Sequence, residues 1–137
     1  MTADDPQAFI RDYYAAWGTG DPNQVLRFFS ENASFEDLAF EARFEGLDQI
    51  RSFAELTYSG APDFQVIPTN VFTSPDGSAG AEWAMTGTHK GDFPGLPATG
   101  RKFEVRASSM IQIEGGKIKT IRDYWSVDTF RRSVGLL

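Results

Sequence analysis

The sequence contains no cysteine and a single histidine, His89. The absence of cysteine excludes disulfides, thiolate nucleophiles and cysteine-ligated zinc or iron–sulfur centres. A lone histidine argues against a transition-metal site. Phosphate-cradling glycine loops, dinucleotide fingerprints and nucleophile elbows are also missing. If the protein is an enzyme, we therefore expect it to work without a cofactor.

Positive charge and long apolar runs are scarce as well. The formal net charge is −6, and the basic residues are scattered apart from Arg131 and Arg132, so no basic stripe is available for the phosphates of a nucleic acid. No apolar stretch approaches the ~18 residues of a membrane span, and the N-terminus lacks the pattern of a signal peptide. These absences predict a cytoplasmic protein that binds neither nucleic acid nor membrane.

Aromatic residues are unusually abundant. The 137 residues include 12 Phe, 4 Tyr and 3 Trp, although the hydrophobic fraction of 41% and the charged fraction of 23% are ordinary. This length and composition predict one globular domain over residues 1–137. The aromatic surplus is interpreted as the lining of a cavity for an apolar ligand. A core that is simply rich in phenylalanine is the alternative.

The first sixty residues show helical spacing. The Asp5-Pro6 and Asp21-Pro22 pairs are start signals, and the apolar residues that follow predict a helix over 6–17 and a shorter one that includes Phe28 and Phe29. A third helix is expected over 47–58. Between them, a short strand over 34–37 and a partner over 43–45 are predicted.

From residue 63 the pattern changes to alternation. Four strands are expected over 64–73, 79–89, 102–113 and 117–126, joined as an antiparallel meander. A closing helix over 129–137 is expected, with Asp128 as its cap. Three helices ahead of a strongly twisted sheet bury their apolar faces on its concave side. The sequence therefore predicts an α+β fold with a pocket between helices and sheet.

Three residues are candidates for acid/base chemistry. Strand alternation places Asp37 on the same face as the apolar Phe35, and a carboxylate in an apolar pocket has a raised pKa that suits a general base. Tyr13 lies among apolar neighbours on the first helix and could donate to an oxyanion. His89 could transfer a proton. The alternatives are a turn residue for Asp37, plain packing for Tyr13 and a satisfied structural histidine for His89.

Further residues are candidates for the wall of the pocket. In the second long strand, alternation groups Trp83 and Met85 on one face with His89. The loop over 92–98 is rich in Pro and Gly and is a candidate lid. The expected apolar wall consists of Trp17, Phe35, Trp83, Met85, Phe103 and Tyr124.

The segment over 86–101 (TGTHKGDFPGLPATGR), together with 116–118 (GKI), 122–125 (RDYW) and 134–137 (VGLL), resembles the SnoaL-like polyketide and ester cyclases of the nuclear transport factor 2-like superfamily. The resemblance implies a cone-shaped fold with a curved antiparallel sheet, homodimers, and cofactor-free aldol ring closure through an enolate. His89 matches a histidine frequent in that group. Those cyclases carry a catalytic Asp after an aromatic residue near the end of the last strand, where this chain has Ser126.

The first half resembles the ketosteroid isomerases of the same superfamily. The matching segments are 13–21 (YYAAWGTGD), 35–37 (FED) and 44–46 (FEG). The resemblance implies that Asp37 is the base and Tyr13 the oxyanion donor. A second donor, an Asp in those enzymes, corresponds to Ser109 here, which donates a weaker hydrogen bond. Ser109 and Ser126 therefore join the ligand-binding candidates.

Three functions stay open from the sequence. The first is an enzyme that enolises a hydrophobic ketone or ester, with Asp37 as base, and so isomerises or cyclises a polyketide- or steroid-like ring. A ketosteroid isomerase-like double-bond isomerase is a narrower version. The second is a binding domain that uses the same pocket without chemistry. The third is a structural module that pairs through its sheet.

Overall fold

The computed structural model describes residues 5–137. Its helices are α1 (Pro6–Trp17), α2 (Pro22–Leu26), α3 (Gly46–Gly60) and α4 (Val127–Ser133). Aspartates cap the first two: Asp5 accepts a hydrogen bond from the Ala8 amide at 3.1 Å, and Asp21 accepts one from the Asn23 amide at 2.9 Å. A proline follows each cap, where its missing N–H costs the helix nothing. The two Asp-Pro start signals are thus confirmed.

Six strands form one sheet in the order β2-β1-β6-β5-β4-β3. They are β1 (Phe29–Asp37), β2 (Ala42–Glu45), β3 (Gln65–Thr73), β4 (Ser78–Thr88), β5 (Lys102–Glu114) and β6 (Lys117–Tyr124). The pairs β3–β4, β4–β5 and β5–β6 form the predicted antiparallel meander. In contrast, β1 and β6 pair in parallel, which hairpin signals do not predict. This pairing brings the C-terminal ends of β1 and β6 together.

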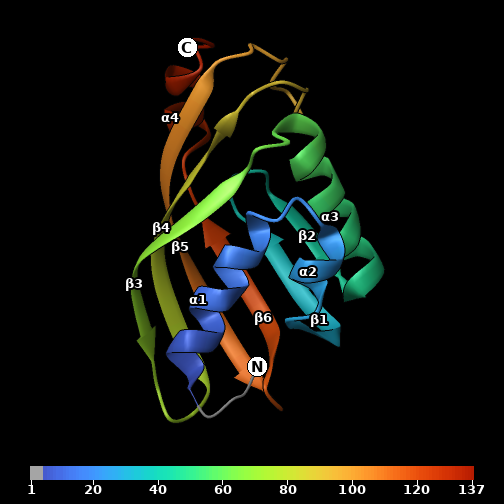
Figure 1. The fold of residues 1–137 in the computed structure, drawn as a ribbon, viewed down its shortest axis with the longest axis vertical. Coiled ribbons are helices and arrows are strands. Elements are labelled where there is room, and N and C mark those ends of the chain that lie inside the picture. Colours follow the sequence, from blue (N-terminus) through green and yellow to red (C-terminus); the bar gives the residue numbers. More distant parts are fainter. Residues whose placement is uncertain (1–4) are drawn as a thin grey trace.

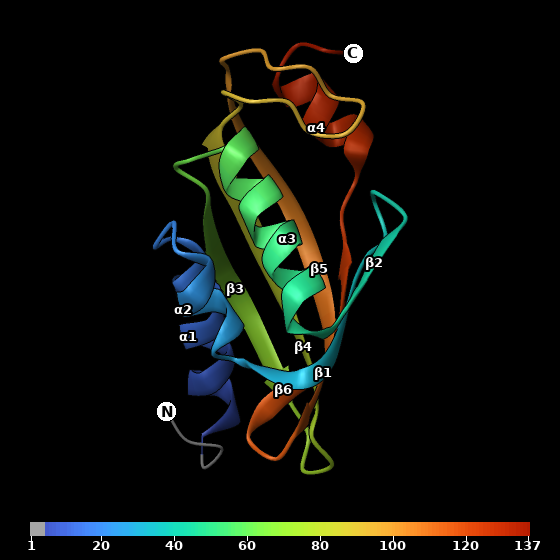
Figure 2. The same cartoon turned by 90° about the vertical axis from the view of Figure 1, so that its right-hand side faces the viewer.

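The helices cover the concave face of the curved sheet, as expected for this α+β fold (Figures 1 and 2). Helix α1 packs along β3, and α3 packs against β1. Their apolar faces meet those of the strands in a core of buried rings. Helix α4 and the loop between β4 and β5 lie together at one end of the molecule (Figure 2). The sheet, α3 and this end enclose the site described below.

Several predicted boundaries are wrong: the last strand ends at Tyr124 instead of residue 126, and the closing helix spans Val127–Ser133 instead of 129–137. Phe29 was expected in the second helix but begins β1. Its ring and that of Phe28 pack against Tyr13, at centroid distances of 5.5 and 5.9 Å, so tertiary packing decides their conformation. Helix α4 is capped by Ser126, whose hydroxyl accepts the Thr129 amide at 3.1 Å. Asp128 lies inside the helix and pairs with Arg131 instead.

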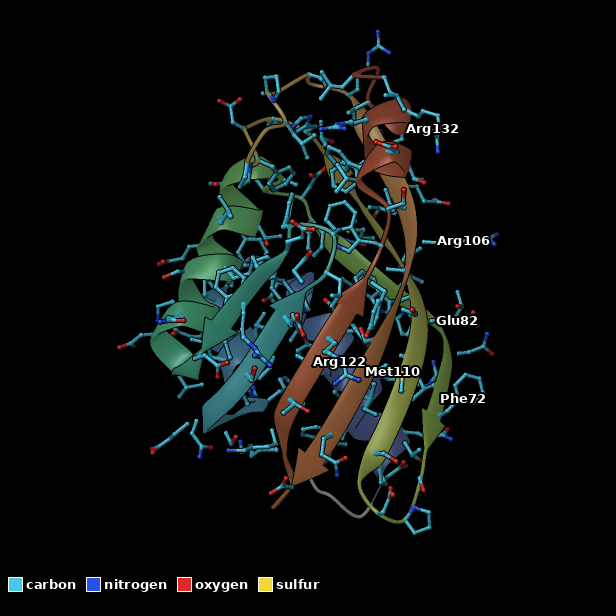
Figure 3. All side chains as sticks on the ribbon, turned by 180° about the vertical axis from the view of Figure 1, so that it is seen from behind. Phe72, Glu82, Arg106, Met110, Arg122 and Arg132 are labelled. Atoms are coloured by element: carbon cyan, nitrogen blue, oxygen red, sulfur yellow. The ribbon has the colours of Figure 1, made fainter. Side chains whose placement is uncertain are left out.

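The outer face of the sheet carries mixed side chains (Figure 3). Phe72 and Met110 are exposed there, near the charged side chains of Glu82, Arg106 and Arg122. The homodimer implied by the family resemblance stays a prediction. Within residues 5–137, no helix is long and apolar enough to cross a membrane.

Candidate active site

A pocket of ≈ 60 Å³ lies between the helices and the concave face of the sheet. Its wall is mostly aromatic and contains two carboxylates, which extend from neighbouring strands. The lining residues are Tyr14, Trp17, Asp37, Phe40, Phe53, Thr57, Phe64, Val66, Trp83, Met85, Phe93, Phe103, Asp123, Trp125 and Phe130.

Asp37 is the last residue of β1, and its side chain is 2% exposed. One carboxylate oxygen accepts the Phe40 amide at 3.0 Å, and the other accepts the indole N–H of Trp125 at 3.0 Å. Burial raises the pKa of Asp37, while these hydrogen bonds and the Ala39 amide lower it. The strand alternation that pointed Asp37 inward with Phe35 is confirmed by their burial.

Asp123 is the second carboxylate, and sequence reasoning gave it no role. It lies opposite Asp37 in the parallel β1–β6 register and opposite Ser109 in the β5–β6 register. The Ser109 hydroxyl donates to Asp123 Oδ1 at 2.6 Å and accepts the indole N–H of Trp83 at 2.8 Å. The pKa of Asp123 is raised to about 8: burial raises it most, the Ser109 hydrogen bond lowers it, and the charge of Asp37 raises it.

The two carboxylates therefore have different proton affinities. Near neutral pH the environment favours a protonated Asp123 beside an ionised Asp37, because like charges on adjacent strands do not ionise together easily. Titratable groups whose pKa values are driven apart in this way are suited to separate acid and base roles. The pair can thus take a proton at one position and donate one at the other.

Tyr14, rather than the predicted Tyr13, lines the pocket. Its ring lies 5.7 Å from that of Trp83, and its buried hydroxyl has no hydrogen-bond partner among the described residues. Burial raises the pKa of Tyr14 most, the charge of Asp123 raises it too, and the nearby Ser109 hydroxyl lowers it. The hydroxyl is therefore a neutral donor. Tyr13 is also buried, but its ring packs against Phe28 and Phe29 outside the lining set.

The other predicted wall residues divide into two groups. Trp17, Trp83, Met85 and Phe103 line the pocket. Phe35 packs in the core instead, with its ring 4.9 Å from that of Phe53. Tyr124 is 40% exposed and lies on the outer face, where its hydroxyl accepts Arg122 Nε at 3.2 Å. Ser126 caps α4 and Ser109 donates its hydrogen bond to Asp123, and neither serine is among the lining residues.

His89 holds the loop between β4 and β5 and does not line the pocket. The ring is fully buried, with Nε2 at 3.1 Å from the Leu96 carbonyl, to which it donates, and Nδ1 at 3.2 Å from the Thr99 hydroxyl. It also stacks on Phe93, with the ring planes 7° apart. Because Phe93 lines the pocket, His89 fixes part of the wall through this loop. A proton-transfer role for His89 stays a prediction.

Asp123 is expected to make folding stability depend on pH. The folded protein keeps a proton up to a pKa of about 8, whereas the unfolded chain releases it near 3.8. The contribution of this proton to the stability of the folded state is therefore complete below about pH 4 and is lost as the pH rises toward 8. We expect the urea-unfolding free energy to fall by about 1–3 kcal/mol between about pH 5 and 8, since one pKa unit corresponds to about 1.36 kcal/mol and pocket water offsets part of it.

Asp123→Asn should reduce this slope, because the amide does not titrate and its oxygen can still accept the Ser109 hydroxyl. A smaller slope should remain, since the pKa of Asp37 is raised as well. Equal slopes in the variant and the wild type would contradict the assignment.

Among residues 5–137, no three His, Asp or Glu side chains converge as a metal site would require.

Solved structures of known proteins share this fold. A protein with a ketosteroid isomerase-like fold from Catenulispora acidiphila, solved in complex with trimethylamine, matches with 22% identity and a TM-score of 0.84 over 100% of this chain and 96% of that one. TsrD from Streptomyces laurentii matches with 22% identity and a TM-score of 0.85, over 100% and 99%. A proposed polyketide cyclase from Pseudomonas putida KT2440 matches with 25% identity and a TM-score of 0.81, over 98% of each chain.

These likenesses confirm the nuclear transport factor 2-like fold implied by the sequence. A search of curated proteins finds no match. The family model described as SnoaL-like polyketide cyclase matches residues 7–132, which is nearly the whole chain and includes both pocket carboxylates. The chain therefore belongs to the SnoaL-like polyketide cyclase family.

Proposed function

We propose that the protein catalyses cofactor-free proton transfer at a carbon next to a ketone or ester carbonyl, and so isomerises or cyclises a hydrophobic ring substrate. The observation that carries this proposal is the pair of buried carboxylates, Asp37 and Asp123, on adjacent strands of an aromatic pocket. Membership of the family supports a cyclase or isomerase type of chemistry. The fold alone does not select a substrate, since this scaffold hosts many activities.

Asp37 is the base in this mechanism. Its ionised oxygens are held by the Phe40 amide and the Trp125 indole, and its buried position gives it a higher proton affinity than a carboxylate in water. It removes the proton from the carbon, and the electron pair moves to the carbonyl oxygen as an enolate. For isomerisation, Asp37 returns the proton to a different carbon of the enolate.

Asp123 and Tyr14 are the donors to the developing oxyanion. A protonated Asp123 and a neutral tyrosine can each donate a hydrogen bond that strengthens as the enolate forms. In an aldol cyclisation, the enolate carbon attacks a second carbonyl of the substrate, a carbon–carbon bond forms, and the new alkoxide takes the proton from Asp123; Asp37 then releases the proton it removed and Asp123 regains one, which restores the starting state. Ser109 positions Asp123 through the 2.6 Å hydrogen bond.

The test measures proton transfer before the natural substrate is known. Wild-type protein is incubated in heavy water with a panel of cyclic and steroidal ketones, and deuterium at the carbons next to the carbonyl is measured by mass spectrometry. We expect incorporation well above that of buffer and of heat-unfolded protein. Binding of these ketones without any incorporation would contradict the proposal.

A second candidate function is a binding domain without chemistry. One observation favours it: Ser126, at the position where the family's cyclases carry a catalytic Asp, is used as a helix cap. Such a domain would bind apolar ring compounds in the same pocket, and its affinity for a neutral ketone would not change with pH. Calorimetric titration of a ketone at several pH values separates this candidate from the enzyme.

A further inference from the structure

The pocket wall has the composition of an aromatic cage. Ten of its fifteen lining side chains are aromatic, and all three tryptophans of the chain are among them. The faces of these rings carry partial negative charge and attract cations, tryptophan most strongly. A neutral apolar ligand could be buried equally well by aliphatic side chains such as leucine or valine. Val66 and Met85 are the aliphatic members of the lining set.

The titratable acids in the wall, Asp37 and Asp123, have no basic side chain beside them, and Asp37 is the one that is ionised near neutral pH. Asp37 and Asp123 line the pocket, and no Lys, Arg or His does. Within residues 5–137, the ion pairs are Arg43–Glu45 and Arg131–Asp128, so neither pocket carboxylate has a cationic partner. Burial of a carboxylate without a counter-charge is unfavourable. A cation in the cavity would remove this penalty.

The polar atoms that remain free also suit a cation. Asp123 Oδ1 accepts the Ser109 hydroxyl, while Oδ2 makes no hydrogen bond with the described residues. A cavity of ≈ 60 Å³ has room for a group of a few heavy atoms. A metal ion is a poor fit, because Ca²⁺ and Mg²⁺ need about six oxygen ligands and the wall offers mainly rings. An ammonium group bearing methyl groups is weakly hydrated and presents carbon to the ring faces.

We propose that this pocket binds a small alkylammonium group, with its methyl groups against the aromatic rings and its charge beside Asp37 and Asp123. The ligand is either a free amine or the amine-bearing end of a larger molecule, and both share this chemistry. The inference goes beyond the enolisation proposed above and does not depend on it. Absence of deuterium exchange on ketones leaves it intact, and weak cation binding leaves the exchange chemistry intact.

The test compares choline with its neutral carbon isostere, in which a tert-butyl group replaces the trimethylammonium group. The two molecules have nearly the same shape, so a difference in affinity reports the charge. By isothermal titration calorimetry we expect choline to bind at least about tenfold more tightly, as for cations in desolvated aromatic sites. Affinity for choline should rise with pH as Asp123 ionises, because the charge of choline itself does not change.

Variants localise the effect. Measured above about pH 8, where Asp123 is ionised, Asp37→Asn and Asp123→Asn should each reduce the preference for choline over its isostere, whereas Asp12→Asn, on the exposed face of α1, should not. Near-ultraviolet circular dichroism confirms that each variant is folded. The proposal is overturned if wild-type protein binds neither molecule, if it binds both equally, or if the preference survives in folded Asp37→Asn and Asp123→Asn. Larger trimethylammonium compounds then distinguish a free amine from the end of a longer ligand.

Discussion

Asp37→Asn is expected to reduce the rate of deuterium exchange by about 100- to 10,000-fold, the usual contribution of a positioned general base. The amide is nearly isosteric with the carboxylate but cannot take a proton from carbon at neutral pH. The measurement is the exchange assay in heavy water, run on any ketone that the wild-type protein exchanges. A rate within a few-fold of wild type would remove Asp37 from the mechanism.

The structure also predicts how well this variant folds. Asp37 accepts two N–H groups, from Phe40 and Trp125, and asparagine offers one acceptor oxygen. Its NH₂ group must therefore face one of these donors, at a cost of about 1 kcal/mol or more. Urea unfolding measures that cost. A folded but inactive Asp37→Asn separates loss of the base from loss of structure.

Trp125→Phe provides the matched control. It keeps a ring in the pocket wall and keeps the carboxylate, but it removes the indole donor that lowers the pKa of Asp37. Most of the exchange rate should therefore survive at the pH optimum, where Asp37 is ionised and Asp123 is still protonated. The acid limb of the pH–rate profile should move to higher pH, because the proton now leaves Asp37 less readily. An unchanged profile would show that a different group titrates.

The parts of the fold that depend on local signals could be predicted from the sequence. The Asp-Pro caps fixed the starts of α1 and α2, and alternation of apolar residues identified the meander of β3 to β6. Alternation also placed Asp37 inside. The parallel contact of β1 with β6 could not be read in the same way, because it joins segments more than eighty residues apart with no hairpin between them.

The most important residue of the site was missed for a specific reason. The β5–β6 register shifts between Gln112 and Ile113, which makes Lys119 an extra residue in β6. Strict alternation from the buried Ile118 would point Tyr124 inward and Asp123 outward. The extra residue forms a β-bulge, after which the side chains exchange faces, so that Asp123 points inward and Tyr124 outward. Ile121 could have indicated the correct orientation, because this apolar residue lies two positions before Asp123 and so on the same face of the strand.

Tyr13 was preferred over Tyr14 because of the family resemblance and its helical spacing to Phe9 and Trp17. Both tyrosines are buried on α1, so the hydrophobic pattern of the helix cannot separate them. What separates them is the position of the sheet beneath the helix. Tyr14 lies over Trp83 and Asp123, whereas Tyr13 lies over the start of β1.

Tyr14→Phe is expected to lower the exchange rate by about 100-fold, the usual cost of removing one oxyanion donor. The same variant should be as stable as the wild type or more stable. The Tyr14 hydroxyl is buried without a hydrogen-bond partner, and an unsatisfied polar group of this kind costs about 1–3 kcal/mol in a folded protein. Exchange kinetics and urea unfolding of the same preparation measure both effects.

Opposite changes in activity and stability are what distinguish a functional hydroxyl from a structural one. A hydroxyl retained for packing would leave the rate unchanged when removed, whatever happened to stability. Tyr13→Phe is the matched control: its hydroxyl lies outside the lining set, so the rate should stay close to that of the wild type. If Tyr13→Phe loses the activity and Tyr14→Phe keeps it, the assignment made from the sequence resemblance is right, and the oxyanion lies deeper under α1 than the pocket described here.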